Sequence, residues 1–589
     1  MTLRFVRWFR RIFAVIFFVA ISAQFLDVYH QLPDIWYEYH PTKAQLFPSL
    51  LNLLGTGSVL AGAAFITVSV VTLIFGRAYC SFLCPFGILM DFVRWLATYP
   101  TKSKFLKSTK LGAFCKRKFA RIAFSPAWNK VRAFFVGIAI VLIAFGGAAL
   151  VGLIEPYSLF GKIFGCIVYP AVSEGTNAVS NFLAARGNYS VPSVSGHAAV
   201  ALPALGLALF ILCAISFLSA VRGRLYCNTV CPVGGYLGFL ARYSLFKLEL
   251  NPAKCIACGL CEKICKAQCI DSRRRNLDFS RCVLCLDCAS TCRKSAVHFT
   301  WRYRSAKKKE PLPEEEKNQK SPAVPAAPQR TMDRRAFVKA LPAFAALFGT
   351  AAKVKEGQPL PKPEDSDKPY VILPDASPYY VDGKRPDKRL TPLPGSRSLE
   401  RFFSKCTGCQ ICVSTCKSQM LKPSITEWGL GGIMRPFMDF DKGFCVQECI
   451  ECTKVCPSDA LIPLTVEEKK LEKLGTAIFR EDLCVVKKDE TDCSACGEHC
   501  PVAAIEMLPY KPEKHLYIPY IHEDVCIGCG ACENICPVVP YKALVIQGSN
   551  HIRKAKVFDD SMRLYVPEET KPAETESAEP VDTDNPFPF

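Results

Sequence analysis

The chain has 589 residues, which is too many for one hydrophobic core, so several domains are expected. Half of its residues are apolar, which favours membrane segments over a merely well-packed soluble protein. The net charge of +20 would indicate nucleic-acid binding only if the basic residues formed a patch on a folded soluble surface. Many of them lie instead in loops beside apolar stretches, so no nucleic-acid partner is expected.

Four apolar stretches are long enough to cross a bilayer, at about residues 12–29, 58–76, 133–154 and 199–221. Arginines precede the first stretch, and the loop of residues 77–132 is crowded with bases against the single acid Asp91. By the positive-inside rule the amino terminus, this loop and the segment after residue 221 are cytoplasmic. Residues 1–245 are therefore predicted to form an α-helical integral membrane domain with four crossings.

A cysteine motif recurs immediately after the second and fourth stretches. It reads RAYCSFLCPFG at residues 77–87 and RLYCNTVCPVG at residues 224–234. The repeat indicates an internal duplication of a two-helix unit. Two thiols four residues apart share one helical face and cannot complete a tetrahedral site alone, but two pairs can supply four ligands. Shared metal ligation and redox or structural thiols are equal alternatives for Cys80, Cys84, Cys227 and Cys231.

The spacing of the 32 cysteines is typical of metal sites, because Cys-x2-Cys-x2-Cys-x3-Cys runs place four thiolates around one compact centre. Residues 246–303 contain two such runs and are predicted to form a cytoplasmic α+β module like bacterial ferredoxins, with two 4Fe-4S clusters. In such modules the fourth cysteine crosses over, so Cys265 is expected to complete the second cluster and Cys292 the first. The predicted ligands are Cys255, Cys258, Cys261, Cys265, Cys282, Cys285, Cys288 and Cys292.

Four cysteines belong neither to the repeated motif nor to any of the quartets in either half of the chain. Cys269 occupies the position where other runs have a small residue, and we interpret it as buried apolar filler. Cys115, Cys166 and Cys213 have no partner at ligand spacing and receive the same interpretation.

Residues 304–332 are charged and Pro-Ala-rich and are predicted to be a solvated linker. Residues 333–355 follow, with Arg334-Arg335 ahead of a short apolar run, which is the pattern of a twin-arginine export signal. The alternatives are cleavage at Ala352, which would separate two polypeptides, and retention as a fifth membrane anchor. Export of an already folded domain suits a cluster protein, because clusters are assembled in the cytoplasm.

The second half is predicted to comprise a Pro-rich approach (356–400), an exported four-cluster ferredoxin-like domain (401–555) and an acidic tail (556–589). Two of its four quartets keep the 2-2-3 spacing, and the other two widen the first gap without losing a thiolate. Zinc ribbons are disfavoured because they use separated Cys-x2-Cys pairs. Six 4Fe-4S clusters are thus expected in the chain, two cytoplasmic and four exported. The ligands of this domain are Cys406, Cys409, Cys412, Cys416, Cys445, Cys449, Cys452, Cys456, Cys484, Cys493, Cys496, Cys500, Cys526, Cys529, Cys532 and Cys536.

The apolar stretches, the cysteine motifs and the Arg334-Arg335 signal together resemble the patterns of two known families. Residues 1 to about 300 resemble the NapH family of membrane quinol dehydrogenase components, and residues from about 331 to 550 resemble the NapG/MauM family of exported ferredoxin-type proteins. The resemblance implies a fusion, in a bacterial inner membrane, that moves electrons from membrane quinol to a periplasmic reductase such as nitrate reductase, or to a cytochrome c acceptor. Asp333 stands where such export signals usually have Ser or Thr.

Two other functions stay open. One is an accessory or assembly factor that matures or maintains a partner metalloenzyme, and the other is a ferredoxin-linked route from cytoplasmic donors to the quinone pool. The sequence does not identify the quinol site, since His30, His40 and Glu155 are expected to be plain interfacial residues. The two cysteine pairs are expected to face the cytoplasm, so no connection between the two sets of clusters is predicted.

Overall fold

The computed structural model describes residues 3–38, 41–102, 109, 119, 123–194, 201–301 and 391–565. The linker, the Arg334-Arg335 stretch and nearly all of the Pro-rich approach lie outside these residues. The export signal and its cleavage at Ala352 therefore stay predictions.

The first part of the chain is helical, and its longest helices are α1 (Leu3–Leu26) and α12 (Leu202–Arg222). Within the described residues, the segments Phe5–Leu26 and Leu202–Arg222 are the helices long and apolar enough to cross a membrane. The expected crossing at 58–76 contains α4 (Ala63–Phe75), and the one at 133–154 overlaps α8 (Asn129–Ala144). Helix α8 ends early because Gly146 adopts a left-handed conformation with φ 72°. Two of the four predicted crossings thus have a helix of spanning length, and the other two stay predictions.

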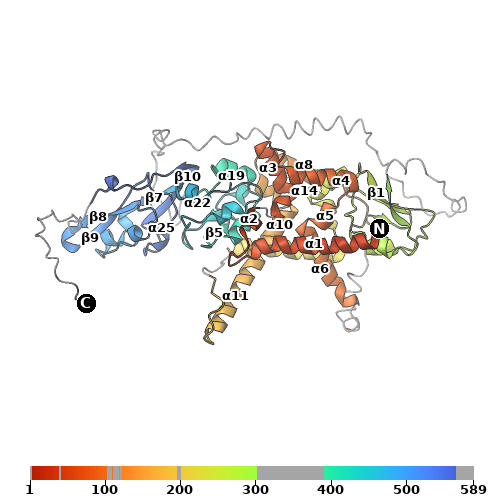
Figure 1. Cartoon of the computed structure of the whole chain (residues 1–589), viewed down its shortest axis with the longest axis horizontal. Helices are drawn as coiled ribbons and strands as arrows, with labels where there is room; N and C mark the ends of the chain where they lie inside the picture. Colours follow the sequence, from red (N-terminus) through yellow and green to blue (C-terminus); the bar gives the residue numbers. More distant parts are fainter. Residues whose placement is uncertain are drawn as a thin grey trace, which may run out of the picture.

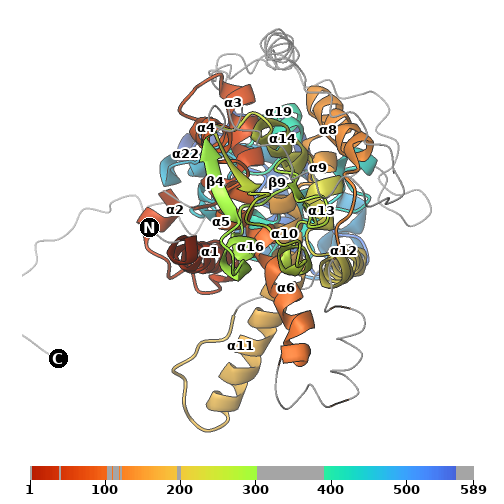
Figure 2. The same ribbon diagram turned by 90° about the vertical axis from the view of Figure 1, so that its right-hand side faces the viewer.

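Shorter elements fill the space between these helices. They are α2 (Asp34–Glu38), η1 (Pro41–Ala44), α3 (Leu46–Thr56), α5 (Tyr79–Phe82), α6 (Pro85–Lys102), α9 (Ala148–Val151), α10 (Pro156–Ile163), the π-helical turn η3 (Phe164–Val168), α11 (Tyr169–Ala184), α13 (Leu225–Thr229) and α14 (Pro232–Ala241). The lower ends of α6 and α11 extend away from the body of the molecule in both views (Figures 1 and 2).

The first ferredoxin-like module follows α14. Strand β1 (Phe246–Leu250) pairs antiparallel with β4 (Val297–Trp301), so that the two ends of the module meet, with Phe246 opposite Trp301. Between them lie α15 (Leu260–Ile264), the short hairpin of β2 (Ile270–Asp271) and β3 (Asn276–Leu277), and α16 (Asp287–Thr291). This is the α+β arrangement expected for residues 246–303.

The second ferredoxin-like domain comprises residues 391–565, and its core includes the fully buried Leu393, ahead of the predicted start at residue 401. Its longest pairing joins β7 (Glu472–Phe479) to β10 (Leu544–Lys554), and β8 (Ile505–Lys511) forms a hairpin with β9 (Leu516–Ile521). The other elements are α19 (Leu399–Lys405), α20 (Ile411–Ser414), β5 (Leu421–Pro423), η6 (Leu430–Gly432), β6 (Pro436–Met438), α21 (Glu451–Lys454), α22 (Val466–Lys470), η7 (Glu481–Leu483), α23 (Val485–Lys488), α24 (Ala495–Glu498), η8 (Pro512–Lys514), α25 (Ala531–Ile535) and η9 (Asp560–Met562).

The three parts follow one another along the long axis of the molecule. Figure 1 shows the first module with β1 at one end, the helices in the middle, and the second domain extending to β8 and β9 at the other end. In the end-on view of Figure 2, β4 and α16 of the first module face the reader. One buried apolar cluster runs from Cys265 of the first module, through Cys80 and Cys227, to Cys409 of the second domain. The helical part therefore forms a continuous packed connection between the two ferredoxin-like parts.

Candidate iron-sulfur centres

The third and fourth quartets of the second domain line two cavities. Residues Cys500, Cys526, Cys529 and Cys532 line one cavity, and Cys484, Cys493, Cys496 and Cys536 line the other. The fourth cysteine of each run thus lies with the first three of the other run. The pairing in this domain, which the spacing leaves open, is the exchange found in two-cluster ferredoxins.

The first and second quartets show the same exchange. The thiol of Cys456 interacts electrostatically with the first three cysteines of the other run, Cys406, Cys409 and Cys412. Cys416 interacts in turn with Cys445, Cys449 and Cys452. The second domain is therefore built from two units, each with two exchanged quartets.

In the first module, Cys265 interacts electrostatically with Cys285 and Cys288 of the second run, which is the predicted crossover. Cys269 is buried, as predicted, but its Sγ lies 3.5 Å from that of Cys265. Its position beside a ligand goes beyond the role of apolar filler. Cys166 is buried as expected, whereas Cys213 is exposed, so the prediction of a buried position is wrong for Cys213. Cys115 lies outside the described residues.

Backbone N–H groups support the last thiol of several runs. Ala504 N donates to Cys500 Sγ at 3.2 Å, Ala296 N to Cys292 Sγ at 3.3 Å, and Leu461 N to Cys456 Sγ at 3.4 Å. These bonds stabilise a thiolate, which is the form that ligates iron. The donor is the alanine four residues after the last cysteine in the first two cases, and the leucine five residues after it in the third.

The donor groups at these sites indicate clusters rather than single ions. In the described ranges no group of three or more His, Cys, Asp or Glu side chains is close enough to hold one metal ion. A cubane keeps its four sulfur ligands further apart, one on each iron. In the two cavities of the second domain, cysteines are the only lining residues with metal-binding side chains, and this donor set fits 4Fe-4S clusters and does not fit a zinc ribbon.

Burial disfavours the thiolate form of these cysteines, so a bound ligand or a nearby cation is needed to stabilise that form. Burial raises the pKa of Cys406 to about 12 and that of Cys529 to about 12. The buried side chain of Lys469 lies between two exchanged quartets and interacts with Cys445, Cys452 and Cys529. Burial alone would lower the pKa of Lys469, but the negative charges of Cys445, Glu472, Cys452 and Cys529 together outweigh it and the pKa is raised. Lys469 therefore stays cationic between two sites that concentrate negative charge.

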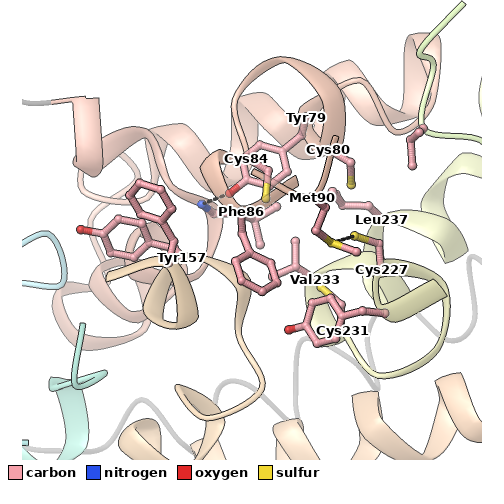
Figure 3. Close-up of a cluster of buried hydrophobic side chains, with 14 of the residues drawn as sticks. Tyr79, Cys80, Cys84, Phe86, Met90, Tyr157, Cys227, Cys231, Val233 and Leu237 are labelled. Atoms are coloured by element: carbon pink, nitrogen blue, oxygen red, sulfur yellow. Dashed lines mark hydrogen bonds between the residues drawn. The ribbon is translucent and has the colours of Figure 1, made fainter. Parts of the chain in front are cut away.

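The repeated cysteine motifs meet inside the helical part. Figure 3 shows Cys80 and Cys84 on one side of Phe86 and Met90, and Cys227 and Cys231 on the other. All four thiols are buried, and Cys231 interacts electrostatically with each of the other three. These pairs lie in the same buried core as residues of both ferredoxin-like parts, and their expected cytoplasmic orientation stays a prediction.

Glu155 and His30, expected to be plain interfacial residues, have specific surroundings in the structure. Glu155 is completely buried and caps α10, accepting from Tyr157 N at 3.0 Å and Ser158 N at 2.6 Å. It is therefore not a plain interfacial residue. His30 is half-buried and lies where Lys417 and Glu451 of the second domain affect its charge. His40 lies outside the described residues.

Sequence reasoning missed the cations that surround these thiols. Lys162 is completely buried in α10, where Nζ donates to the Gly152 carbonyl at 2.8 Å and lies near Glu155 and Cys409. Arg77 and Arg224 are also almost completely buried. The two arginines had a signal in the sequence, since each stands three residues before the first cysteine of its motif.

Two protein families match parts of the chain. A family described as a 4Fe-4S binding domain matches residues 58–107 and 204–251, the two segments that carry the repeated motif. A family described as a 4Fe-4S dicluster domain matches residues 491–539, which contain most of the last two quartets. The matched segments agree with the internal duplication and with the paired sites of the second domain.

Individual relatives are similar over part of the chain. The ferredoxin-type protein NapG of Escherichia coli is 31% identical over 154 residues, covering 25% of this chain and 66% of NapG. The methylamine utilization ferredoxin-type protein MauM of Methylobacillus flagellatus is 31% identical over 148 residues, covering 24% of this chain and 62% of MauM. An uncharacterized protein of Methanocaldococcus jannaschii is 26% identical over 239 residues, covering 41% of this chain and 70% of that protein. No solved structure matches the chain.

The chain is a ferredoxin-type iron-sulfur protein. It is related to NapG, MauM and the ferredoxin-type protein NapF of Escherichia coli over part of its length. The bound clusters of a ferredoxin-type protein supply one-electron transfer, while the protein provides their ligands, spacing and electrostatic surroundings. This ferredoxin-type protein has an additional helical part that brings two further cysteine pairs between its cluster domains.

Proposed function

We propose that this ferredoxin-type protein is the electron-transfer subunit of a quinol dehydrogenase and a natural fusion of NapH-type and NapG/MauM-type components. Membrane quinol is oxidised at the helical part, and electrons leave through the second domain to a periplasmic redox partner. Nitrate reductase and a c-type cytochrome are the candidate acceptors. The names of the relatives and the two apolar helices, α1 and α12, support this proposal.

The observation that carries the proposal is the contact between the second domain and the helical part. The loop that holds the first quartet lies directly on α9 and α10, with Thr407 against Gly152 and Cys409 against Gly161. A side chain at either glycine would collide with the backbone of that loop. Donors and acceptors of electrons must approach closely, and this contact brings a cluster-binding loop to the helices without intervening side chains.

Polar contacts hold the same interface. Asn52 Nδ2 in α3 donates to the Pro457 carbonyl at 3.1 Å, next to the crossover ligand Cys456. Gln419 donates through Nε2 to the Tyr169 hydroxyl of α11. Both contacts fix segments beside cluster ligands, so the interface positions the quartets and does more than join two domains.

Glu155 and Lys162 are both buried in this region and supply ionisable groups at the interface. Oxidation of one quinol releases two electrons and two protons, and the electrons leave one at a time through iron-sulfur centres. We place the proton acceptor at the Glu155 carboxylate, because its helix α10 also carries the contact with Cys409. The amino terminus and first module are cytoplasmic in this proposal, and the second domain is periplasmic.

The test is quinol-driven reduction of the clusters in inverted and right-side-out membrane vesicles that contain the full chain. We expect a reduced quinol analogue to bleach the visible absorbance of the oxidised clusters and to produce their EPR signals. An added periplasmic acceptor should restore the absorbance. If the clusters stay oxidised with quinol but are reduced by dithionite, the proposal is wrong and an accessory role becomes the better explanation.

A further inference from the structure

The two cysteine motifs are held together by a reciprocal exchange of arginine contacts. Arg77, three residues before Cys80, donates to the Cys227 carbonyl of the other repeat at 3.0 Å. Arg224, three residues before Cys227, donates to the Cys80 carbonyl. Each repeat thus completes the surroundings of the opposite cysteine pair, as expected if the two pairs act as one site.

The second cysteine of each pair has equivalent surroundings. Cys84 Sγ accepts from Gly87 N at 3.4 Å, and Cys231 Sγ accepts from Gly234 N at 3.2 Å. These sulfurs lie at the starts of α6 and α14, where the helix dipole also favours a thiolate. A side chain at Gly234 would collide with the Cys227 carbonyl and press on Arg77, so the turn needs glycine.

Buried positive charge lies beside the thiols, and an anionic centre bound to them would neutralise it. Arg77 is completely buried, and its Nη2 lies 3.7 Å from Cys80 Sγ. Within the described part of the chain, no carboxylate pairs with Arg77, and its Nε has no hydrogen-bond partner. An unpaired buried guanidinium is costly, and four thiolates that bind iron would provide the missing negative charge. The second arginine, Arg224, is paired with Asp91 at 2.9 Å.

The site is also connected to a cluster-binding part at each end. Toward the first module, Arg77 donates to the Ser280 carbonyl at 3.3 Å, and Asn228 Nδ2 donates to the Ala267 carbonyl at 3.0 Å. These carbonyls lie two residues from Cys282 and Cys265. Toward the second domain, the Tyr226 hydroxyl donates to the Ile154 carbonyl at 2.6 Å, immediately before Glu155 and α10.

From this juxtaposition we propose that Cys80, Cys84, Cys227 and Cys231 hold one further iron-sulfur centre, which relays single electrons between the first module and the second domain. The centre gains one electron from one side and loses it to the other, with no bond formed and no proton moved. A four-thiolate cluster carries a net charge of about −2 in its oxidised form. Arg77 and Arg224 are positioning residues that offset this charge. The inference deepens the proposed function and relies on it for the direction of electron flow, but the existence of the centre is independent of quinol oxidation.

The first experiment measures iron and acid-labile sulfide in the full chain purified without oxygen. The double variant Cys84→Ser/Cys231→Ser should lose about four iron atoms per chain relative to the unchanged protein, if the centre is a cubane, or about two if it is a two-iron cluster. Cys213→Ser, an exposed cysteine of α12, is the matched control and should lose none. Retention of all iron in the double variant, or thiols that are instead found as a disulfide pair in the unchanged protein, would overturn the proposal.

A second experiment separates charge compensation from folding. A redox titration followed by EPR should show one component that disappears in the double cysteine variant. Arg77→Gln should shift this component to lower potential, because removal of a positive charge disfavours the added electron, while Arg77→Lys should largely restore it. Arg94→Gln removes another buried arginine of the helical part, which donates to the Ala220 carbonyl, and should leave the potential unchanged. An equal shift in Arg94→Gln, or no shift in Arg77→Gln, contradicts the role of Arg77.

This outcome is distinguishable from that of the quinol test. Failure of the iron measurement would leave six clusters that quinol can still reduce. Failure of the quinol test would leave the iron content unaffected. It would also leave unaffected the redox titration of the EPR component that disappears in the double cysteine variant.

Discussion

The backbone of Gly161 in α10 lies directly against the carbonyl oxygen of Cys409, which belongs to the first quartet of the second domain. This contact joins residues that are almost 250 positions apart in the chain. It makes the interface sensitive to a single added methyl group, and it places a cluster-binding loop on a helix of the helical part.

Replacement of Gly161 by leucine should weaken the contact between the two halves. The added side chain forces the backbone of the Cys409 loop away, at a cost of about 1–3 kcal/mol or more. With a protease site inserted into residues 304–332, the second domain of the unchanged protein should remain bound to the helical part after cleavage, and that of Gly161→Leu should separate. The measurement is size-exclusion chromatography of the cleaved protein in detergent.

Gly137→Leu is the control for this variant, because Gly137 lies on α8 with open space around its Cβ position. The control protein should stay associated after cleavage. Separation of both variants, or of neither, would show that the Gly161 contact does not hold the domains together.

Replacement of Lys469 by methionine should lower the reduction potentials of the adjacent clusters. Lys469 interacts with Cys445, Cys452 and Cys529, and loss of its positive charge makes an added electron less favourable by about 1 kcal/mol. An EPR-monitored redox titration should show the shift for the two sites that contain these cysteines. Lys470→Met, which removes a more exposed neighbouring lysine, is the control, and a shift of equal size there would contradict the argument.

Glu472 predicts a pH dependence for the second domain. Both of its carboxylate oxygens accept from Gly395 N at 3.1 Å, and burial raises the pKa of Glu472 to about 7. The folded state therefore binds a proton that the unfolded state has released between about pH 4.5 and 7, so stability falls as pH rises through this window. Glu472→Gln removes a penalty of up to about 3 kcal/mol at pH 8 and should have no such advantage at pH 5.

The temperature at which the visible absorbance of the clusters is lost measures this effect. At pH 8 it should be higher for Glu472→Gln than for the unchanged protein, and at pH 5 the two should agree. Glu468→Gln, at the exposed capping box of α22, should not reproduce the gain. A gain that is the same at both pH values would mean that the pKa of Glu472 is not the cause.

Replacement of Glu155 by glutamine tests the proposed proton acceptor. Glutamine keeps one of the two oxygens, which accept separately from Tyr157 N and Ser158 N, so α10 retains part of its cap while the carboxylate is lost. We expect the rate of quinol-driven cluster reduction in vesicles to fall by about 100-fold or more, and reduction by dithionite to be unchanged. Glu174→Gln on the exposed side of α11 should have the normal quinol rate. A normal rate in Glu155→Gln would exclude Glu155 as the acceptor.

The sequence by itself determined the ligands and the kind of chemistry. The spacing of three cysteines around a tight loop is a local pattern, because one loop wraps three ligands around one cluster. The crossover of Cys265 and the duplication of the motif around Cys80 and Cys227 could also be predicted without a structure, because both follow from the order and spacing of the cysteines. The small residues after the runs were visible too, and two of them, Ala296 and Ala504, donate their N–H groups to the last thiol.

Only the tertiary structure decided how these local units are combined. The exchange of Cys500 and Cys536 depends on the packing of loops around two cavities, and nothing in the spacing of either run specifies the partner run. The place of Cys80, Cys84, Cys227 and Cys231 between two cluster domains, the reciprocal contacts of Arg77 and Arg224, and the contact of Gly161 with Cys409 likewise join distant segments. Such contacts arise from close packing of the whole core, which a periodic or local pattern does not encode.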